Sequence, residues 1–164
     1  MKIESVLAFE IAKLFNSEFV ADDLYTRKTY SKDLWPRNLI LARDQKQTDP
    51  TISAVVWPRS KEELSRFVVL ANERNWEMYP YGAGSGVCGG CTPEGETGLP
   101  RIVIDFKRMD AIEKIDDTSL IAKVQAGILG QVLEETLNMK GYTLGHFPSS
   151  IYFSSFGVYL STRD

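Results

Sequence analysis

Metal-binding and thiol side chains are scarce in this sequence, which has one histidine and two cysteines among 164 residues. A structural zinc site needs four sulfur or nitrogen ligands, so His146, Cys88 and Cys91 do not suffice without a carboxylate. The Cys-x-x-Cys spacing is that of redox pairs, which lie at the start of a helix. Residues 92–95, Thr-Pro-Glu-Gly, indicate a turn instead. We therefore favour two thiols in a loop over a redox or metal site.

Strong charge and long apolar runs are also absent. A net charge of −3 gives no basic surface for nucleic acid or for an anionic membrane. No apolar run is long enough to span a bilayer. Glu4, Glu10 and Lys13 interrupt the N-terminal apolar residues, as the core of a signal peptide would not tolerate. We expect a cytoplasmic protein with no nucleic-acid partner and no transmembrane segment.

Apolar residues recur at helical spacing in three segments. Ser60 and Glu63 have the spacing of a capping box, and an apolar stripe follows them. Gly141 is a typical stop signal after the third segment. We expect helices over 3–15, from Ser60 onward, and over 127–140.

Short β-branched and apolar runs predict strands over 51–58, 78–81, 101–106 and 119–125. The segment 22–50 is polar and contains Pro36 and Pro50, so we expect it to be irregular. The tail from Tyr142 is rich in small and aromatic residues and is expected to be strand-like. This order of elements favours an α/β or α+β fold.

The densest motif is YPYGAGSGVCGGC, residues 79–91. Gly84, Gly86 and Gly89 match the dinucleotide pattern G-x-G-x-x-G, and Asp105 lies where a ribose-binding acid would follow. That fingerprint requires a helix directly after the glycines, which the proline- and glycine-rich residues 91–100 cannot form. Two alternatives stay open: backbone N–H groups that bind an anion without a helix, and a glycine-rich hairpin with no ligand.

The loop PYGAGSGVCGG also resembles the first pyrophosphate loop of the vanillyl-alcohol oxidase (PCMH-type) FAD-binding domains. Four further segments resemble the same family in the same order: VVWPRSKEEL, RIVIDFKRMDAIEKID, AKVQAGILGQVLEETLNMKGYTLGHFPSS and FSSFGVYLSTRD. The resemblance implies an α+β fold, with an N-terminal helix, a first subdomain containing a βαβ unit and an incomplete second subdomain. It implies that 1–50 is an N-terminal helical and irregular segment and that 51–164 is the first part of an FAD-binding domain.

The resemblance implies FAD as cofactor, with residues 80–86 around the pyrophosphate. Some relatives bind flavin covalently through a histidine, and Ser85 stands at that position here, which implies non-covalent FAD. Three departures from the family pattern are Val158 in place of a glycine, Ala83 in place of a glycine, and Asp164 in place of a small residue. His146 is expected to be structural rather than a catalytic base. The implied cofactor contacts are Pro80, Tyr81, Gly82, Ala83, Gly84, Ser85, Gly86, Ser149, Ser150, Ser154, Ser155, Thr162 and Arg163.

Three functions remain open. The first is the FAD-binding portion of an oxidoreductase acting on a 2-hydroxy acid or a similar CH–OH substrate. The second is the FAD-binding portion of an alkylglycerone-phosphate synthase-like transferase, because YSKDL and the closing segment resemble both branches. The third is a non-catalytic fragment or nucleotide-binding module. In the first two, a small-molecule substrate is held by a cap domain outside this chain, so no catalytic residue is assigned. Strand edges and apolar surface left uncovered also predict self-association.

Overall fold

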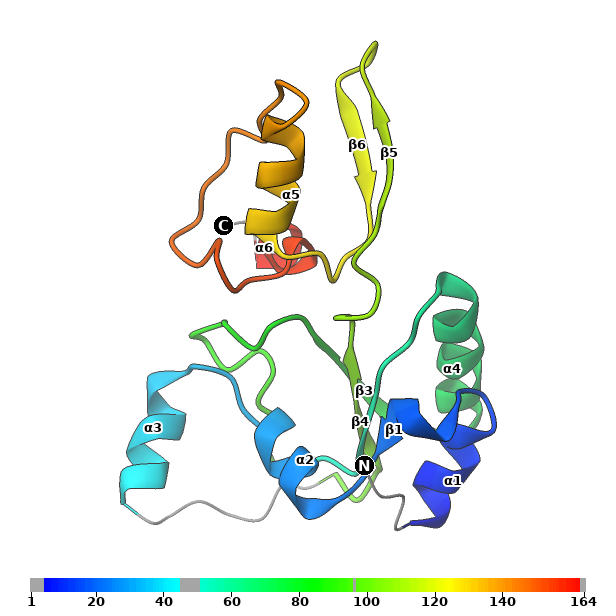
Figure 1. Ribbon diagram of the computed structural model, residues 1–164. Coiled ribbons are helices and arrows are strands. Elements are labelled where there is room, and N and C mark those ends of the chain that lie inside the picture. Colours follow the sequence, from blue (N-terminus) through cyan, green and yellow to red (C-terminus); the bar gives the residue numbers. More distant parts are fainter. Residues whose placement is uncertain (1–4, 45–50, 96, 163–164) are drawn as a thin grey trace.

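The computed structural model describes residues 5–44, 51–95 and 97–162. Its centre is a four-stranded sheet in the order β1-β2-β4-β3 (Figure 1). Strands β2, β4 and β3 are parallel, and β1 runs antiparallel to β2 at one edge. The strands are β1 (Val20–Ala21), β2 (Ala54–Val56), β3 (Glu77–Tyr81) and β4 (Arg101–Asp105).

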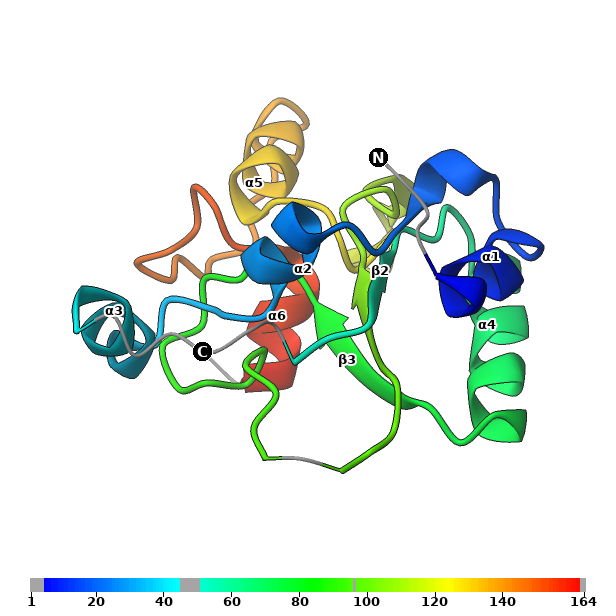
Figure 2. The ribbon, with the colours of Figure 1, turned by 90° about the horizontal axis from the view of Figure 1, so that it is seen from below.

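Helices cover both faces of this sheet, on opposite sides in Figures 1 and 2. Helices α1 (Val6–Ala12) and α4 (Lys61–Glu73) pack on one face, where Phe67 lies in the core with alternate strand residues. Helix α2 (Leu24–Tyr30) contributes Tyr30 to the other face, beside Val55 and Trp57. Because successive strand side chains point to opposite faces, every residue of β2 and β4 is buried. A short helix η1 (Ser17–Phe19) and helix α3 (Pro36–Arg43) complete this half.

The predicted start of α4 is confirmed. The Ser60 side chain accepts a hydrogen bond from the Glu63 N–H at 3.2 Å, as an N-cap should. The Glu63 carboxylate accepts from the Arg59 N–H at 2.8 Å, one residue earlier than a capping box requires. Strands β2 and β3 flank β4 and are connected through α4, which gives the expected βαβ unit.

A second, smaller layer lies above the sheet in Figure 1. It consists of the hairpin β5 (Ile112–Asp116) and β6 (Ile121–Val124) with helices α5 (Gly130–Asn138) and α6 (Phe156–Thr162). Ile128, Leu133 and Leu137 form its core against apolar residues of the hairpin. The predicted mixed α and β fold class is confirmed, and helices 3–15 and 127–140 are present over shorter spans.

Two sequence-based expectations are wrong. Within 22–50, α2 and α3 replace irregular structure: the Asp23 side chain caps α2 by accepting from the Thr26 N–H at 3.0 Å, and Pro36 begins α3, where its missing N–H costs nothing. Residues 45–50 lie outside the described part. The tail contains helix α6 rather than a strand, with Phe156 and Tyr159 at helical spacing and Tyr159 buried.

Strand β5 was not expected at all, because a register shift lies between Ile112 and Lys114. That irregularity separates the two inward apolar residues, Ile112 and Ile115, by three positions instead of two. A search for period-two alternation therefore misses the strand.

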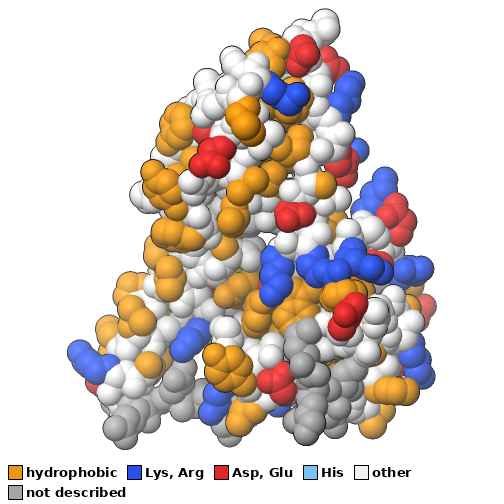
Figure 3. All heavy atoms as spheres, viewed as in Figure 1, with side chains coloured by type: hydrophobic (Ala, Val, Ile, Leu, Met, Phe, Trp, Pro, Cys, Tyr) orange, Lys and Arg blue, Asp and Glu red, His pale blue; other side chains and the backbone are white. Residues whose placement is uncertain are grey.

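Hydrophobic side chains gather over the upper part of the molecule in Figure 3. Several large apolar side chains of this second layer are more than half exposed: Met139, Phe147, Tyr152, Phe153 and Leu160. The expected self-association stays a prediction. No helix of the described residues has the length and apolar character that crossing a membrane requires.

Candidate functional site

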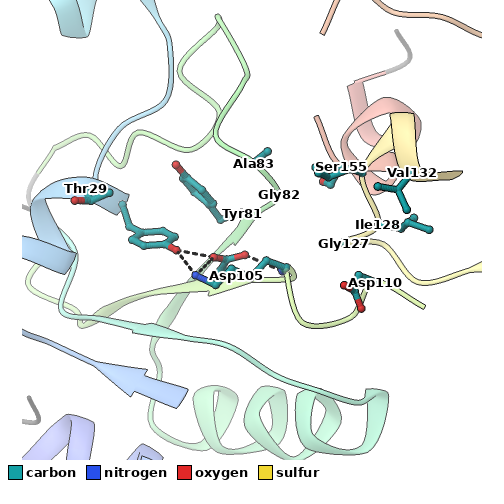
Figure 4. Close-up of a pocket in the computed structure, with 13 residues that line it drawn as sticks. Thr29, Tyr81, Gly82, Ala83, Asp105, Asp110, Gly127, Ile128, Val132 and Ser155 are labelled. Atoms are coloured by element: carbon teal, nitrogen blue, oxygen red, sulfur yellow. Dashed lines mark hydrogen bonds and ion pairs between the residues drawn. The ribbon is translucent and has the colours of Figure 1, made fainter. Parts of the chain in front are cut away.

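A cavity of about 430 Å³ lies between the sheet and the second layer (Figure 4). The carboxyl ends of β3 and β4 form one side, and the turn before α5 and the start of α6 form the other. The ends of parallel strands are where α/β sheets bind ligands. Its lining residues are Thr29, Tyr30, Tyr81, Gly82, Ala83, Asp105, Lys107, Asp110, Gly127, Ile128, Leu129, Val132 and Ser155.

The glycine loop begins directly after β3. At two of its glycines, Gly82 and Gly84, a side chain would clash with neighbouring atoms. A Cβ on Gly82 would collide with the side chains of Ser155 and Val158. Gly84 is buried against the Tyr81 hydroxyl with a φ of +67°, a conformation that residues with a side chain rarely adopt. Ala83 has no positive φ, so its replacement of a glycine introduces no backbone strain. The loop is thus shaped for close approach to helix α6.

The backbone N–H groups of residues 82–86 are free to bind a ligand. None of them donates a hydrogen bond to another described residue. The loop instead is fastened through acceptors, since the Gly86 carbonyl accepts from the Leu34 N–H at 3.0 Å. Successive unpaired N–H groups in a glycine turn form an anion-binding concavity. Of the two alternatives left open by the sequence, this geometry favours the anion site.

The serine segment meets the glycine loop at the cavity. The Ser85 and Ser154 hydroxyl oxygens are 2.5 Å apart, a hydrogen bond that joins residues far apart in the sequence. Ser155 is 3% exposed and lines the cavity, yet its Oγ has no hydrogen-bond partner in the described part of the chain. Burying a hydroxyl without a partner is costly. The cavity therefore presents one polar atom that a ligand would satisfy.

The floor of the cavity is a closed polar cluster that sequence reasoning did not assign to the site. The buried Asp105 carboxylate accepts hydrogen bonds from the Tyr30 hydroxyl at 2.6 Å, the Trp57 Nε1 at 2.9 Å and the Lys107 N–H at 2.8 Å. Burial, followed by the Asp105 bond, raises the pKa of Tyr30 well above its ordinary value. The Lys107 ammonium lies 3.1 Å from the Tyr30 oxygen and stays largely exposed at the cavity edge.

This cluster gives Asp105 a structural role instead of the ribose-binding role of a Rossmann acid. Its carboxylate is saturated by donors of the protein itself. No helix follows the glycines among the described residues of 82–100. Tyr30 belongs to YSKDL, a segment noted for its family resemblance, which is the one signal that pointed toward this region.

The structure brings together only some of the predicted cofactor contacts. Tyr81, Gly82, Ala83 and Ser155 line the cavity, and Ser85 with Ser154 lies beside it. Gly84 and Gly86 belong to the same loop without lining the cavity.

The other predicted contacts lie farther away or outside the description. Pro80 is in β3, and its carbonyl is 3.6 Å from the Cys91 sulfur. Ser150 belongs to the turn before Ser154, whose N–H donates to the Ser150 carbonyl at 2.9 Å, and Ser149 is exposed beside it. Thr162 ends α6, exposed. Arg163 lies outside the described residues.

The two cysteines are free thiols near this loop. Cys88 is exposed, whereas burial raises the pKa of Cys91 to about 11. Neither thiol lines the cavity. A raised pKa disfavours the thiolate and is the opposite of what a redox-active cysteine shows.

Comparison with known proteins now identifies the domain. The family model described as "FAD binding domain" matches residues 52–164. The chain belongs to this FAD-binding domain family. FAD is its cofactor, and the predicted resemblance to the PCMH-type flavoenzymes is confirmed.

Two curated relatives illustrate the range of this FAD-binding domain. The alkyldihydroxyacetonephosphate synthase of Dictyostelium discoideum is 34% identical over 154 residues, which are 93% of this chain and 25% of the synthase. The glycolate oxidase subunit GlcD of Bacillus subtilis is 34% identical over 131 residues, 80% of this chain and 25% of that subunit. The chain thus spans about a quarter of the relatives it matches.

Solved structures agree with this assignment. A structure of an alkyldihydroxyacetonephosphate synthase superposes with a TM-score of 0.87 at 31% identity, covering 98% of this chain and 29% of that chain. The 4-ethylphenol oxidase of Gulosibacter chungangensis superposes with a TM-score of 0.67 at 25% identity, covering 92% of this chain and 28% of that chain.

Proposed function

We propose that this chain is the FAD-binding portion of a longer flavoenzyme and that its cavity receives the FAD pyrophosphate. The proposal rests on the buried, unpartnered Ser155 Oγ, which lines the cavity beside Gly82 of the glycine loop (Figure 4). A phosphate oxygen would accept a hydrogen bond from this hydroxyl and from the free N–H groups of residues 82–86. The residues present therefore fit the group.

The proposed roles follow from charge and hydrogen-bonding capacity. The N–H groups of Gly82 to Gly86 hold the pyrophosphate, and Ser155 donates from the segment before α6, beside Gly82. Lys107, whose side chain is 57% exposed at the cavity edge, provides the positive charge among lining residues that also include the carboxyl groups of Asp105 and Asp110. The lining residues include no histidine or cysteine, which supports non-covalent binding at this cavity.

When bound, the flavin would supply electron transfer, or would hold the substrate covalently. This chain binds and orients the cofactor and keeps its pyrophosphate in a partly enclosed site. We propose that the small-molecule substrate is held by another part of the same enzyme. No residue of this chain is assigned to substrate chemistry.

Two classes of whole enzyme are proposed. A synthase like the alkyldihydroxyacetonephosphate synthases is supported by near-complete coverage of this chain and by the TM-score of 0.87. An oxidoreductase acting on a 2-hydroxy acid is supported by the glycolate oxidase relative, which matches 80% of the chain at similar identity. Anaerobic mixing of the full gene product with glycolate separates them, because an oxidoreductase of this kind loses its visible flavin absorbance and a synthase keeps it.

Ser155→Ala tests the cavity assignment. Removing a hydroxyl that has no protein partner should leave the melting temperature unchanged or slightly higher. The same change should weaken FAD binding about fivefold to tenfold, the effect of one hydrogen bond of about 1 kcal/mol or more. Affinity is measured by titration of flavin fluorescence, and retention by visible absorbance after desalting.

Thr136→Val is the matched control, because its hydroxyl lies on α5 and donates to the Val132 carbonyl at 2.7 Å. We expect it to leave FAD affinity unchanged. Unaltered FAD affinity in Ser155→Ala would remove Ser155 from the site. If neither the chain nor the full gene product retains flavin, the proposed function itself is wrong.

A further inference from the structure

The turn between α2 and α3 contacts the glycine loop on the side away from the cavity. This turn lies outside the region that the family model matches. Residues 33–38 contact residues 86–92 at several points. The loop that carries the free N–H groups is therefore held from behind by the N-terminal segment. In Figure 2 this segment, between α2 and α3, runs alongside the loop that follows β3.

Asp33 is the centre of this contact. Its side chain is buried, at 7% exposure, and it accepts hydrogen bonds within its own turn from the Trp35 N–H at 3.1 Å. From the glycine loop it accepts the Thr92 hydroxyl at 3.2 Å and the Cys91 N–H at 3.4 Å. Asn38 closes the network, since its amide donates to Thr92 Oγ1 at 3.0 Å and to Asp33 Oδ1 at 3.3 Å. A buried carboxylate with several donors is a strong, directional anchor.

Two contacts beside Asp33 fix the same stretch of loop. The Leu34 N–H donates to the Gly86 carbonyl at 3.0 Å. Gly86 is the last residue of the proposed anion-binding turn. Gly89, with a φ of +81°, packs against the Trp35 ring so closely that a Cβ would lie 2.7 Å from a ring carbon. Gly86 and residues 89–92 are thus both attached to the turn that Asp33 organises.

We propose that Asp33 is a positioning residue for the cofactor, acting through the glycine loop. This inference rests on the proposed function of residues 82–86. A loop whose N–H groups must converge on an anion loses affinity if it has to be ordered on binding. Asp33 holds residues 86–92 in place before the ligand arrives, so that the glycine loop needs less ordering when the cofactor binds. Asp33 itself does not line the cavity.

The test compares Asp33→Asn and Thr92→Val with the wild-type chain. Asparagine replaces one acceptor oxygen by a donor, and valine removes the Thr92 hydroxyl without changing charge. Asp116→Asn is the matched control, because Asp116 also accepts two backbone N–H groups but ends β5, at the tip of the hairpin and away from the glycine loop (Figure 1). Melting temperatures are measured first, and all binding is measured well below them.

Both variants should bind FAD about tenfold more weakly, which corresponds to about 1.4 kcal/mol. Competition by ADP, which carries the same pyrophosphate, should weaken by the same factor. A role limited to global stability lowers the melting temperature but leaves the dissociation constant at low temperature unchanged. Asp116→Asn should match the wild type in both affinities.

A second readout works without cofactor. The Cys91 thiol lies inside the gripped stretch, and Cys88 is exposed within it. Alkylation of Cys91 relative to Cys88, followed by mass spectrometry, should accelerate at least threefold in Thr92→Val, where no charge near the thiol has changed. Asp33→Asn should accelerate it further, since the neighbouring negative charge is also lost.

The outcomes test the anchoring role, the positioning role and the proposed function separately. Unchanged Cys91 alkylation in both variants overturns the anchoring role of Asp33. Faster alkylation with unchanged FAD and ADP affinity overturns the positioning role. If neither the wild-type chain nor the full gene product binds FAD or ADP, the proposed function of the loop is refuted and the positioning role with it, while the alkylation rates still decide the anchoring.

Discussion

Gly82→Ala, which adds one methyl group, should push the Ser155 segment away from the glycine loop. The Cβ of an alanine there would overlap the Ser155 hydroxyl and a methyl group of Val158. Ser155 is buried, so its side chain has little room in which to move. Ser155 and the start of α6 should therefore move away from the end of β3, which changes the cavity that Gly82 and Ser155 both line.

The size of the effect follows from overpacking. Inserting a methyl group into a packed contact costs about 1–3 kcal/mol. For a chain of this size, each 1 kcal/mol lowers the melting temperature by roughly 2–4 °C. FAD affinity should fall more steeply than stability, because the Ser155 hydroxyl and the N–H groups of the loop would no longer face one ligand at hydrogen-bonding distance.

Gly90→Ala is the control within the same loop, because a Cβ at Gly90 meets no atom within 4 Å and the residue has no positive φ. It should be neutral, or stabilising by about 0.4–1 kcal/mol through the unfolded chain. Calorimetry and FAD titration of both variants provide the comparison. Val158→Ala should restore part of the loss in Gly82→Ala. A Gly82→Ala protein with the melting temperature and FAD affinity of the wild type would refute the close contact.

Two further predictions concern the floor of the cavity. Asp105→Ala leaves the Tyr30 hydroxyl without its acceptor and leaves Trp57 Nε1 only the 3.3 Å bond to the Tyr30 oxygen. The change should cost roughly 1–3 kcal/mol in urea unfolding, the cost of one unsatisfied donor, and a loss below about 1 kcal/mol would contradict this. Burial raises the pKa of Tyr30 and of Tyr81 above their ordinary value of 10.0, so stability is fully present below that pH and is lost as pH rises toward the folded pKa values. The urea concentration at the midpoint of unfolding should fall as the pH is raised from about 9 to about 12, and it should fall less in Tyr30→Phe. An equal fall in both proteins would contradict the assignment.

The parts of the fold that sequence predicts well are those where a local pattern has one structural solution. The centre of RIVID, residues 102–104, is continuously apolar, as a strand buried on both faces of a parallel sheet requires. The cap at Ser60 is likewise a local signal with a local consequence. Strand β5 fails this condition, because its register shift is fixed by pairing with β6 rather than by its own residues.

The candidate site divides in the same way. The glycine loop could be predicted from residues 79–91, because closely spaced glycines are typical of backbone that closely approaches a ligand or another segment. Tyr30 and Asp33 could not be placed, since their contacts with Asp105 and Thr92 join residues more than fifty positions apart. Only the fold brings the N-terminal segment behind the loop, so the pattern of residues 22–50 alone indicates a polar connection and nothing more.

Val158 shows how a departure from a family pattern can be absorbed by the contact it makes. A valine in place of the family's glycine adds a side chain close to the cofactor site. In the structure a Val158 methyl group occupies the space next to Gly82, and Val158 does not line the cavity. The neighbouring Gly157 keeps the close approach of backbone to backbone, because a Cβ there would lie 2.8 Å from the Ala126 carbonyl oxygen. The contact between α6 and the loop needs one residue without a side chain, and Gly82 already provides it.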